Sequence, residues 1–476
     1  MSFVTITFAL FLVLVFGLHW AVPRAVWQRA ILLVASYFFY GWWDWRFCGL
    51  MMISGMTGFF VAMAMSGCSS PVRRRRLLWI SLTVELGILG FFKYFNFFAD
   101  SFVLGMAALG FDVSTTTFHV VLPVGISFYT FQSLAYVIDV YRGREAERDP
   151  VLYLLYLSFF PQLVAGPIER AGDLLGQLRE VRRFDLEAAV DGCRLILWGL
   201  VKKMVFADRL GGISDQIFAR GADASAPEIM LGTVAFAFQI YGDFSGYSDM
   251  AAGIASLFGV RLSRNFSYPY FARDLADFWR RWHVTLSSWL RDYVFIPLGG
   301  SRGPLRSTLR NILLTFLASG LWHGAAWHYV VWGIWHAVGL GLQLMAGKFQ
   351  KPGRSRLPLW LSGSLLQALR ASATFLYVCL GWIWFRASDV GQGAALFEQL
   401  FTGWNESALT SLKAHTDVFF LLVPWVGIEW LGRSRWNPIA WERVGRGWRW
   451  LGYTAVLGVI VLFGSRRNVE FIYFQF

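Results

Sequence analysis

Long apolar runs, separated by short polar stretches, cover the chain from one end to the other. A helix that crosses the hydrocarbon core of a bilayer needs about 20 mostly apolar residues, and several runs have that length. The pattern therefore predicts an all-α polytopic membrane protein with roughly 10–12 transmembrane helices. The predicted segments are residues 3–20, 28–43, 48–66, 77–98, 118–139, 151–166, 187–206, 229–259, 311–346, 371–385, 418–432 and 450–464.

Basic residues between the runs predict how the chain is oriented. Arg24, the arginine run 73–76 and the three arginines within 142–148 mark loops on one side, whereas 99–118 contains no Lys or Arg. Because cytoplasmic loops of membrane proteins collect Lys and Arg, the basic loops are expected inside and 99–118 outside. The same rule places the basic stretch 261–310 on the cytoplasmic side.

Two segments are too short for a simple crossing. Residues 151–166 contain Pro161 and have basic residues on both flanks, which favours a re-entrant element buried in protein. Residues 311–322, as a helix, rise only about 18 Å against a hydrocarbon core of about 30 Å. A chain that enters there from the cytoplasm is expected to reach His323 while still inside the membrane.

The stretch 261–310 combines charge with large aromatic side chains. It holds nine Arg against three Asp, and charged residues and large aromatics alternate along 274–283, where Arg280 and Arg281 stand between two Trp. The stretch is too polar to span a membrane, so it predicts helices lying in the inner interface.

Composition supports the membrane assignment and gives no reason to expect a nucleic-acid partner. Apolar residues make up 56% of the 476 residues and charged residues only 15%, whereas a soluble domain carries about 25% charged residues. The net charge of +13 follows from cytoplasmic Lys and Arg, so no nucleic-acid partner is predicted. Four scattered cysteines indicate neither a disulfide framework nor a zinc site. With no internal repeat, residues 1–476 are expected to form a single membrane domain.

His323 is the main candidate for chemistry. Trp322, Gly324 and Trp327 surround it in a sequence with no carboxylate, and an ionisable residue at membrane depth indicates function. A neutral buried histidine acts as a general base toward a hydroxyl, and His283 is the first choice for a group that orients it or the reacting groups. A purely structural histidine remains the alternative. Metal binding is not predicted, because HExxH and nearby cysteines are absent.

Polar residues inside apolar runs supply the remaining candidates. In 229–259, polar side chains accompany Gly242 and Gly246, and two interpretations are open: a cavity-lining break in a helix, or hydrogen bonds between closely packed helices. Residues 161–170 predict a rigid turn with polar ends. The tunnel or substrate candidates are Asp243, Ser245, Tyr247, Gln162, Pro167, Arg280 and Arg281, together with Trp322, Gly324 and Trp327.

Six stretches carry a family resemblance, in the family's order, within residues 30–390. They read FFKYFNFF (91–98), LPVGISFYTFQSLAYVIDVYRG (122–143), FFPQLVAGPIER (159–170), DFSGYSDMAAGIASLFG (243–259), NFSYPYFARDLADFWRRWHVTLSSWLRDYVFIPLGG (265–300) and GLWHGAAWHYVVWGIWH (320–336). The chain resembles the membrane-bound O-acyltransferase (MBOAT) family, most closely its alginate O-acetyltransferase (AlgI-like) branch. In that resemblance, His323 matches the family's invariant histidine and His283 the second position, which is His or Asn.

The resemblance implies a fold and an activity. The fold would be a ring of helices around a thinned centre with a tunnel, with a core over about 30–390 and more variable C-terminal helices over about 391–476. The donor substrate would be acetyl-CoA or an acyl-carrier thioester from the cytoplasm, with no bound cofactor. A bacterial inner-membrane enzyme of this type would serve O-acetylation of an exported polysaccharide, such as alginate or cellulose. Its expected partners are a periplasmic acetyltransferase, a polysaccharide synthase and export complex, and membrane lipid.

Two alternatives stay open on the sequence. Relatives of the same family acetylate peptidoglycan or carry D-alanine to teichoic acid. A polysaccharide or lipid-precursor transporter is the alternative of another class, although transporters commonly show inverted repeats, which this chain lacks.

Overall fold

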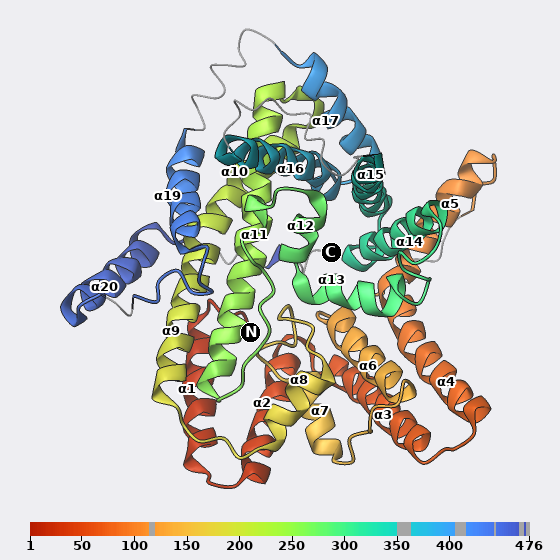
Figure 1. Cartoon of the computed structure of the whole chain (residues 1–476), viewed down its shortest axis with the longest axis vertical. Coiled ribbons are helices and arrows are strands. Elements are labelled where there is room, and N and C mark those ends of the chain that lie inside the picture. The colour runs from red at the N-terminus through yellow and green to blue at the C-terminus, as the bar shows by residue number, and fades with distance from the viewer. Residues whose placement is uncertain (114–119, 350–362, 405–415, 442–443, 466–470, 473–476) are drawn as a thin grey trace. The chain divides into compact units, whose positions relative to one another are not determined.

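The computed structural model describes all residues except 114–119, 350–362, 405–415, 442–443, 466–470 and 473–476 (Figure 1). Within these described ranges the protein is all helical and contains no strand, so the predicted fold class is confirmed. The chain divides into two compact units. The first comprises Met1–Ile196 and Ser248–Ser263, and the second comprises Leu197–Tyr247 and Arg264–Phe476.

The first unit contains the N-terminal helices. They are α1 (Ile6–Ala21), α2 (Ala25–Asp44), α3 (Arg46–Ser66), α4 (Pro71–Leu89), the π-helix η1 (Gly90–Tyr94), α5 (Phe95–Ala108), α6 (Ile126–Tyr141), α7 (Pro150–Ser158) and α8 (Ala171–Arg179). Two long helices, α9 (Leu186–Leu200) and α11 (Ala226–Leu257), contribute residues to both units.

The second unit contains the remaining helices. They are the π-helix η2 (Val201–Ala207), α10 (Asp208–Arg220), η3 (Gly221–Asp223), η4 (Pro269–Phe271), α12 (Leu275–Arg281), α13 (Val284–Leu290), the π-helix η5 (Arg291–Phe295), α14 (Leu305–His323), α15 (Trp327–Phe349), α16 (Gly363–Arg386), α17 (Val390–Thr402), α19 (Asp417–Gly432) and α20 (Arg446–Phe463).

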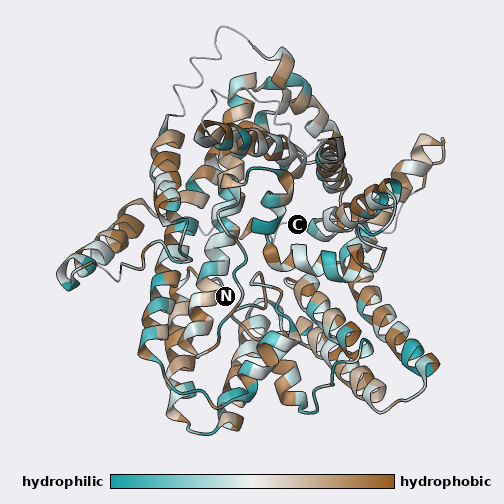
Figure 2. Cartoon of the chain, viewed as in Figure 1, coloured by the Kyte–Doolittle hydropathy of each residue, from teal (hydrophilic) through white to brown (hydrophobic). Residues whose placement is uncertain are grey.

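Four helices are long and apolar enough to cross a membrane by length and composition. They cover Arg46–Ser66, Pro71–Ala108, Trp327–Gly347 and Ser364–Arg386, and the apolar α1 is shorter. Large apolar side chains such as Leu10, Phe60 and Leu376 are more than half exposed in the protein, as expected for surfaces that face lipid. Figure 2 shows mostly hydrophobic residues along α3, α4 and α6, with a hydrophilic end on α4. The protein is therefore a membrane protein, as predicted.

The first unit is held together by a polar contact inside an apolar bundle. Helices α3, α4 and α6 pack against one another. Glu85 of α4 is fully buried, and its two carboxylate oxygens accept hydrogen bonds from Ser54 of α3 at 2.6 Å and Ser133 of α6 at 2.7 Å. One side chain thus joins three helices, and it satisfies polar groups that would otherwise be costly in an apolar interior.

Helix α7 lies at the start of the segment 151–166, which was predicted to be re-entrant. It spans only Pro150–Ser158 and is followed by a non-helical turn through Gly166. Nine helical residues rise about 14 Å, which is less than half of a hydrocarbon core of about 30 Å. The segment is therefore too short for a helical crossing, in agreement with the prediction.

In the second unit, α14 and α15 form a closely packed antiparallel hairpin. A Cβ atom built on Gly320 would lie 2.3 Å from the carbonyl oxygen of Tyr329, and one on Gly333 would lie 2.4 Å from the carbonyl oxygen of Phe316. Only glycine permits such an approach between helix backbones. The hairpin places His323, the last residue of α14, close to the start of α15.

One expectation about helix bounds is wrong, and one of two open interpretations is excluded. The segment ending at His323 is not about 12 residues long, because α14 begins at Leu305 and has 19 residues. Helix α11 has no break, because it is continuous over 32 residues. Its glycines instead admit neighbours: a Cβ on Gly242 would lie 2.5 Å from the Trp425 ring, and one on Gly246 would lie 2.8 Å from the carbonyl oxygen of Gly199. The break is therefore excluded, and these glycines serve the close packing of helices.

The ring of helices with its central tunnel, and the single domain over residues 1–476 with a core at 30–390 and C-terminal helices at 391–476, stay predictions.

Candidate active site

His323 lies in an aromatic enclosure of the second unit. Its side chain is buried, with 3% exposed. The centroid of its ring lies 5.0 Å from that of Trp322, 5.0 Å from that of Trp332 and 5.3 Å from that of Phe385, and all three contacts are edge-to-face. These rings come from α14, α15 and α16. The sequence predicted only the first of them, because the other two lie on other helices.

Gly324 follows the last residue of helix α14, at a position with no room for a side chain. Its backbone is extended, which any residue adopts. However, a Cβ atom at this position would lie 2.0 Å from Cε2 of Tyr329, so the tyrosine ring occupies the place of a side chain. The ring of Tyr329 also lies 5.0 Å from that of Phe385. Gly324 therefore lets the hairpin close directly beside the predicted base.

His283 lies between α12 and α13 with its backbone in the left-handed region, at φ 41° and ψ 56°. Its side chain is 1% exposed, and its Nδ1 atom lies 3.0 Å from Oδ1 of Asn265. Burial lowers the pKa of His283 to about 3, so the imidazole is neutral near pH 7. Its ring lies 4.6 Å from that of Phe244 and 5.6 Å from that of Trp322.

Trp322 connects the two histidines. Its ring makes edge-to-face contacts with both His283 and His323. Thus the structure brings His283 next to the Trp322–His323 pair, and the two were predicted from separate motifs.

A charged cluster lies on η2, α10 and α11. Nζ of Lys203 lies 2.8 Å from a carboxylate oxygen of Asp208 and 2.8 Å from one of Asp243. The other oxygen of Asp243 accepts a hydrogen bond from the backbone N–H of Ile472 at 2.7 Å. All three charged side chains are at most 6% exposed. A buried charge is tolerated when it is paired in this way.

Other predicted residues of α11 are also in contact with polar or aromatic neighbours. Lys202 donates a hydrogen bond to Oγ of Ser245 at 2.9 Å. The ring of Tyr247 lies 4.9 Å from that of Phe471. The predicted polar positions of α11 are therefore tied to other helices and to the C-terminal segment.

A polar pocket of about 270 Å³ borders this cluster. Its polar lining residues are Lys203, Asp208, Asp215, Gln239, Asp243, His328, Arg386 and Ser388. Tyr329 and Phe385 complete its wall, and Phe385 also contacts the ring of His323. One aromatic side chain thus separates the pocket from the predicted base.

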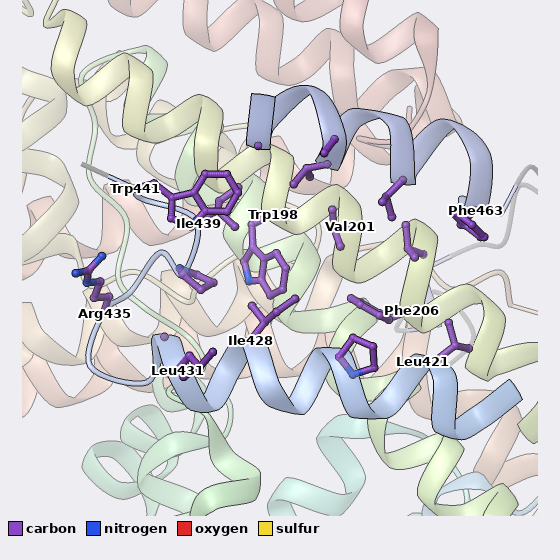
Figure 3. Close-up of a pocket in the computed structure, with 18 of the residues that line it drawn as sticks. Trp198, Val201, Phe206, Leu421, Ile428, Leu431, Arg435, Ile439, Trp441 and Phe463 are labelled. Atoms are coloured by element: carbon purple, nitrogen blue, oxygen red, sulfur yellow. The ribbon is translucent and has the colours of Figure 1, made fainter. Parts of the chain in front are cut away.

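A larger cavity of about 800 Å³ lies among η2, α19 and α20 (Figure 3). Its walls are mainly apolar, with Trp198, Phe206 and Ile428 among them and Arg435 at one end. None of the predicted site residues lines it. The smaller polar pocket is therefore the one that adjoins the candidate chemistry.

The remaining predicted residues lie elsewhere. Trp327 begins α15 and is 56% exposed. Arg280 and Arg281 both form ion pairs with Asp277 on α12.

Gln162 and Pro167 are buried in the first unit, where Nε2 of Gln162 donates to the carbonyl oxygen of Tyr156 at 2.8 Å. The roles of all these residues stay predictions.

Sequence reasoning missed Asn265, Lys203, Asp208, Trp332 and Phe385. The adjacent pair Lys202–Lys203 inside an apolar run was a usable signal, because buried cations need partners. Among the residues the structure describes, no group of three or more His, Cys, Asp or Glu could hold a metal ion. Two further histidines, His119 and His415, lie outside the described residues.

Comparisons with known proteins identify the family of the chain. A family model described as MBOAT, the membrane-bound O-acyltransferase family, matches residues 147–359, which include both histidines. The chain is 38% identical over 416 residues to a probable alginate O-acetylase AlgI of Azotobacter vinelandii, covering 86% of this chain and 80% of that protein.

Two further relatives extend the comparison. A probable alginate O-acetylase AlgI of Pseudomonas putida is 35% identical, covering 98% of each chain. A peptidoglycan O-acetyltransferase of Helicobacter pylori is 32% identical, covering 82% of this chain and 76% of that protein. The transporter alternative is therefore set aside. The chain belongs to the membrane-bound O-acyltransferase family and is an O-acyltransferase.

Proposed function

We propose that this enzyme passes an acetyl group from a cytoplasmic thioester across the bacterial inner membrane for O-acetylation of an exported polysaccharide of the alginate or cellulose type. The observation that carries this proposal is the buried His323, enclosed by aromatic rings beside a polar pocket. The similarity to alginate O-acetylases over most of the chain supports the choice of substrate class.

In the proposed reaction, His323 is the general base. Its neutral imidazole takes the proton from an acceptor hydroxyl while that oxygen attacks the acyl carbon of the thioester. A C–O bond forms, the C–S bond breaks, and the proton passes from His323 to the departing sulfur. General-base catalysis of this kind contributes about 10²- to 10⁴-fold in rate.

His283 orients the reacting groups in this scheme. It is neutral near pH 7 because burial lowers its pKa to about 3. A neutral imidazole has one nitrogen that accepts a hydrogen bond. His283 therefore serves as a fixed, buried hydrogen-bond acceptor beside Trp322.

The donor is proposed to be acetyl-CoA or an acyl-carrier thioester. Both carry phosphate groups, and the stretch 261–310 has nine Arg against three Asp. Arg280 has a side chain that is 67% exposed, so it is accessible to an anionic donor. The Arg content of this stretch assigns it to the cytoplasmic side, which is the side that supplies such thioesters.

The polar pocket is proposed to bind the acceptor next to the site, with the reacting hydroxyl extending past Phe385 to His323. Gln239, His328 and Ser388 line it and offer hydrogen-bond groups of the kind that bind sugars or other alcohols. The proposed partners are a periplasmic acetyltransferase, which completes the transfer, and a polysaccharide synthase and export complex, which supplies the polymer.

Acetyl transfer toward peptidoglycan is the second candidate. The specific observation in its favour is the relative in Helicobacter pylori, which is named peptidoglycan O-acetyltransferase and is 32% identical over 415 residues. The chemistry at His323 would be the same, and only the acceptor would differ. D-alanyl transfer to teichoic acid would likewise keep the base and change the acyl group.

Replacing His323 with Gln tests the proposal. We expect the O-acetyl content of the exported polymer to fall at least about 100-fold in cells that produce H323Q as their only copy. The matched control is His336→Gln, because His336 is another fully buried histidine enclosed by aromatic rings. H336Q should stay within a few-fold of wild type. Normal acetylation by folded, membrane-inserted H323Q would refute the proposed role of His323.

Measuring the acetyl content of peptidoglycan in the same cells distinguishes the two acceptors. Loss from the polysaccharide alone supports the first candidate, and loss from peptidoglycan alone supports the second.

A further inference from the structure

We propose that Asn265 is a positioning residue, which holds His283 in the one neutral tautomer that leaves Nε2 as a hydrogen-bond acceptor. This inference rests on the proposed function, because it assigns His283 to the reaction.

The Oδ1 atom of Asn265 makes three polar contacts. The residue is buried, with 2% exposed. Its Oδ1 atom lies 3.0 Å from Nδ1 of His283, 3.0 Å from Oγ1 of Thr285 and 3.4 Å from the backbone nitrogen of Thr285. The side chain therefore bridges the residues on either side of the start of α13.

The backbone contact identifies the atom that faces His283. A backbone N–H group only donates hydrogen bonds, so the Asn265 atom opposite the nitrogen of Thr285 must be the amide oxygen rather than the amide nitrogen. The same oxygen faces Nδ1 of His283, and an oxygen of this kind only accepts. Nδ1 must therefore carry the proton, and Nε2 of the neutral ring keeps its lone pair.

The backbone of Asn265 holds His283 as well. Its carbonyl oxygen accepts a hydrogen bond from the N–H of Val284 at 2.9 Å. His283 has a positive φ of 41°, which is uncommon for residues other than glycine. Such a conformation persists only where surrounding contacts determine it. Asn265 thus fixes the backbone next to His283 and the tautomer of its ring at the same time.

The nitrogen that keeps its lone pair has no structural partner among the described residues, and its ring lies next to the candidate site. Nε2 of His283 is buried and has no hydrogen-bond partner among the residues that the structure describes. The ring contacts Trp322, which in turn contacts His323. A buried acceptor without a protein partner fits a hydrogen bond from a second hydroxyl of the acceptor, because the proton of the attacking hydroxyl goes to His323. Asn265 does not itself touch the reacting atoms, so it acts through His283.

The test compares Asn265→Leu, which removes the acceptor at similar volume, with Asn265→Asp, which keeps an acceptor oxygen. Initial rates are measured in membrane vesicles with acetyl-CoA and an acetylated carrier protein as donor probes, using whichever the wild type accepts. We expect N265L to lower kcat about 10- to 100-fold with little change in KM for the donor. N265D should retain turnover, with the acidic limb of its pH profile moved to higher pH, because a carboxylate favours the imidazolium.

Thr285→Val is the matched control, since it removes another hydrogen bond to the same oxygen and leaves the contact to His283. T285V should stay within about threefold of wild type. The double variant N265L/H283Q should be no slower than H283Q alone, because a residue that acts only through His283 has no effect once His283 is replaced. Histidine-selective ¹⁵N NMR should show Nδ1–H in wild type and N265D.

The outcomes separate this inference from the proposed function. If H323Q and H283Q lose activity while folded N265L keeps the wild-type rate, Asn265 does not position His283 and only the inference fails. Losses of N265L and H283Q that multiply in the double variant would also overturn it, since they indicate a structural effect. If H323Q remains active, the proposed function fails, whatever Asn265 does. If N265L does not fold, the pH profile and the tautomer of N265D decide.

Discussion

The contact between α14 and α15 at Gly320 is expected to set the position of His323. Gly320 lies three residues before His323 in the same helix. A Cβ atom on Gly320 would lie 2.3 Å from the carbonyl oxygen of Tyr329, where ordinary contacts are 3.4–4 Å. The carbonyl belongs to the backbone of α15, so no side-chain rotation relieves the clash.

The magnitude of the effect of Gly320→Ala follows from this geometry. The two helix backbones must separate by about 1 Å, and overpacking of this kind costs about 1–3 kcal/mol of stability. A displacement of about 1 Å at a catalytic group lowers the rate about 100-fold. We therefore expect G320A to insert in the membrane and remain folded, with acetyl transfer reduced about 100-fold.

The assay measures the acetyl content of the exported polymer and normalises it to the amount of folded protein in the membrane. Gly347→Ala is the matched control, because Gly347 lies in α15 and a Cβ there meets nothing within 4 Å. G347A should acetylate at the wild-type rate. If folded G320A does so too, the hairpin contact does not position the base and the reasoning is refuted.

Two further predictions concern buried carboxylates of the first unit. Burial raises the pKa of Glu169 to about 7 although Ser263 donates to it, so between pH 4.5 and 7 the folded protein keeps a proton that the unfolded chain has lost. The unfolding free energy of the protein should therefore fall by about 3 kcal/mol as pH rises through this window. Melting curves in detergent should show this fall in wild type. If the stability of Glu169→Gln depends on pH in the same way, Glu169 is not the group responsible. Replacing Glu85 with Ala should cost about 1–3 kcal/mol, because the hydroxyls of Ser54 and Ser133 lose their acceptor. Glu85→Gln should cost less, and equal melting temperatures for E85A and E85Q would contradict the bridging role.

The sequence by itself determined the fold class and most helices. The apolar run 48–66 corresponds to α3 at Arg46–Ser66, and 418–432 corresponds to α19 at Asp417–Gly432. Such agreement is expected, since the length of an apolar run and its flanking polar residues are local properties that decide where a membrane helix begins and ends. The motif around His323 was equally visible, because an ionisable residue stands out in an apolar sequence.

Where helices meet could not be predicted from the same information. The polar residues and glycines of 229–259 fitted a broken helix as well as a packed one, and only the neighbours Gly199 and Trp425 decided for a continuous α11. A glycine is compatible with either a flexible break or a close approach, and the partner across the interface selects between them.

The surroundings of the two histidines were likewise decided by tertiary structure. Trp332 and Phe385 enclose His323, and Asn265 contacts His283, although none of them is adjacent in sequence to the histidine it contacts. Hydrophobic patterning specifies which residues are buried but not which buried residues touch, because that depends on how separate helices pack. The chain therefore carries its candidate base in a local motif, whereas the environment that would make this base effective exists only in the folded protein.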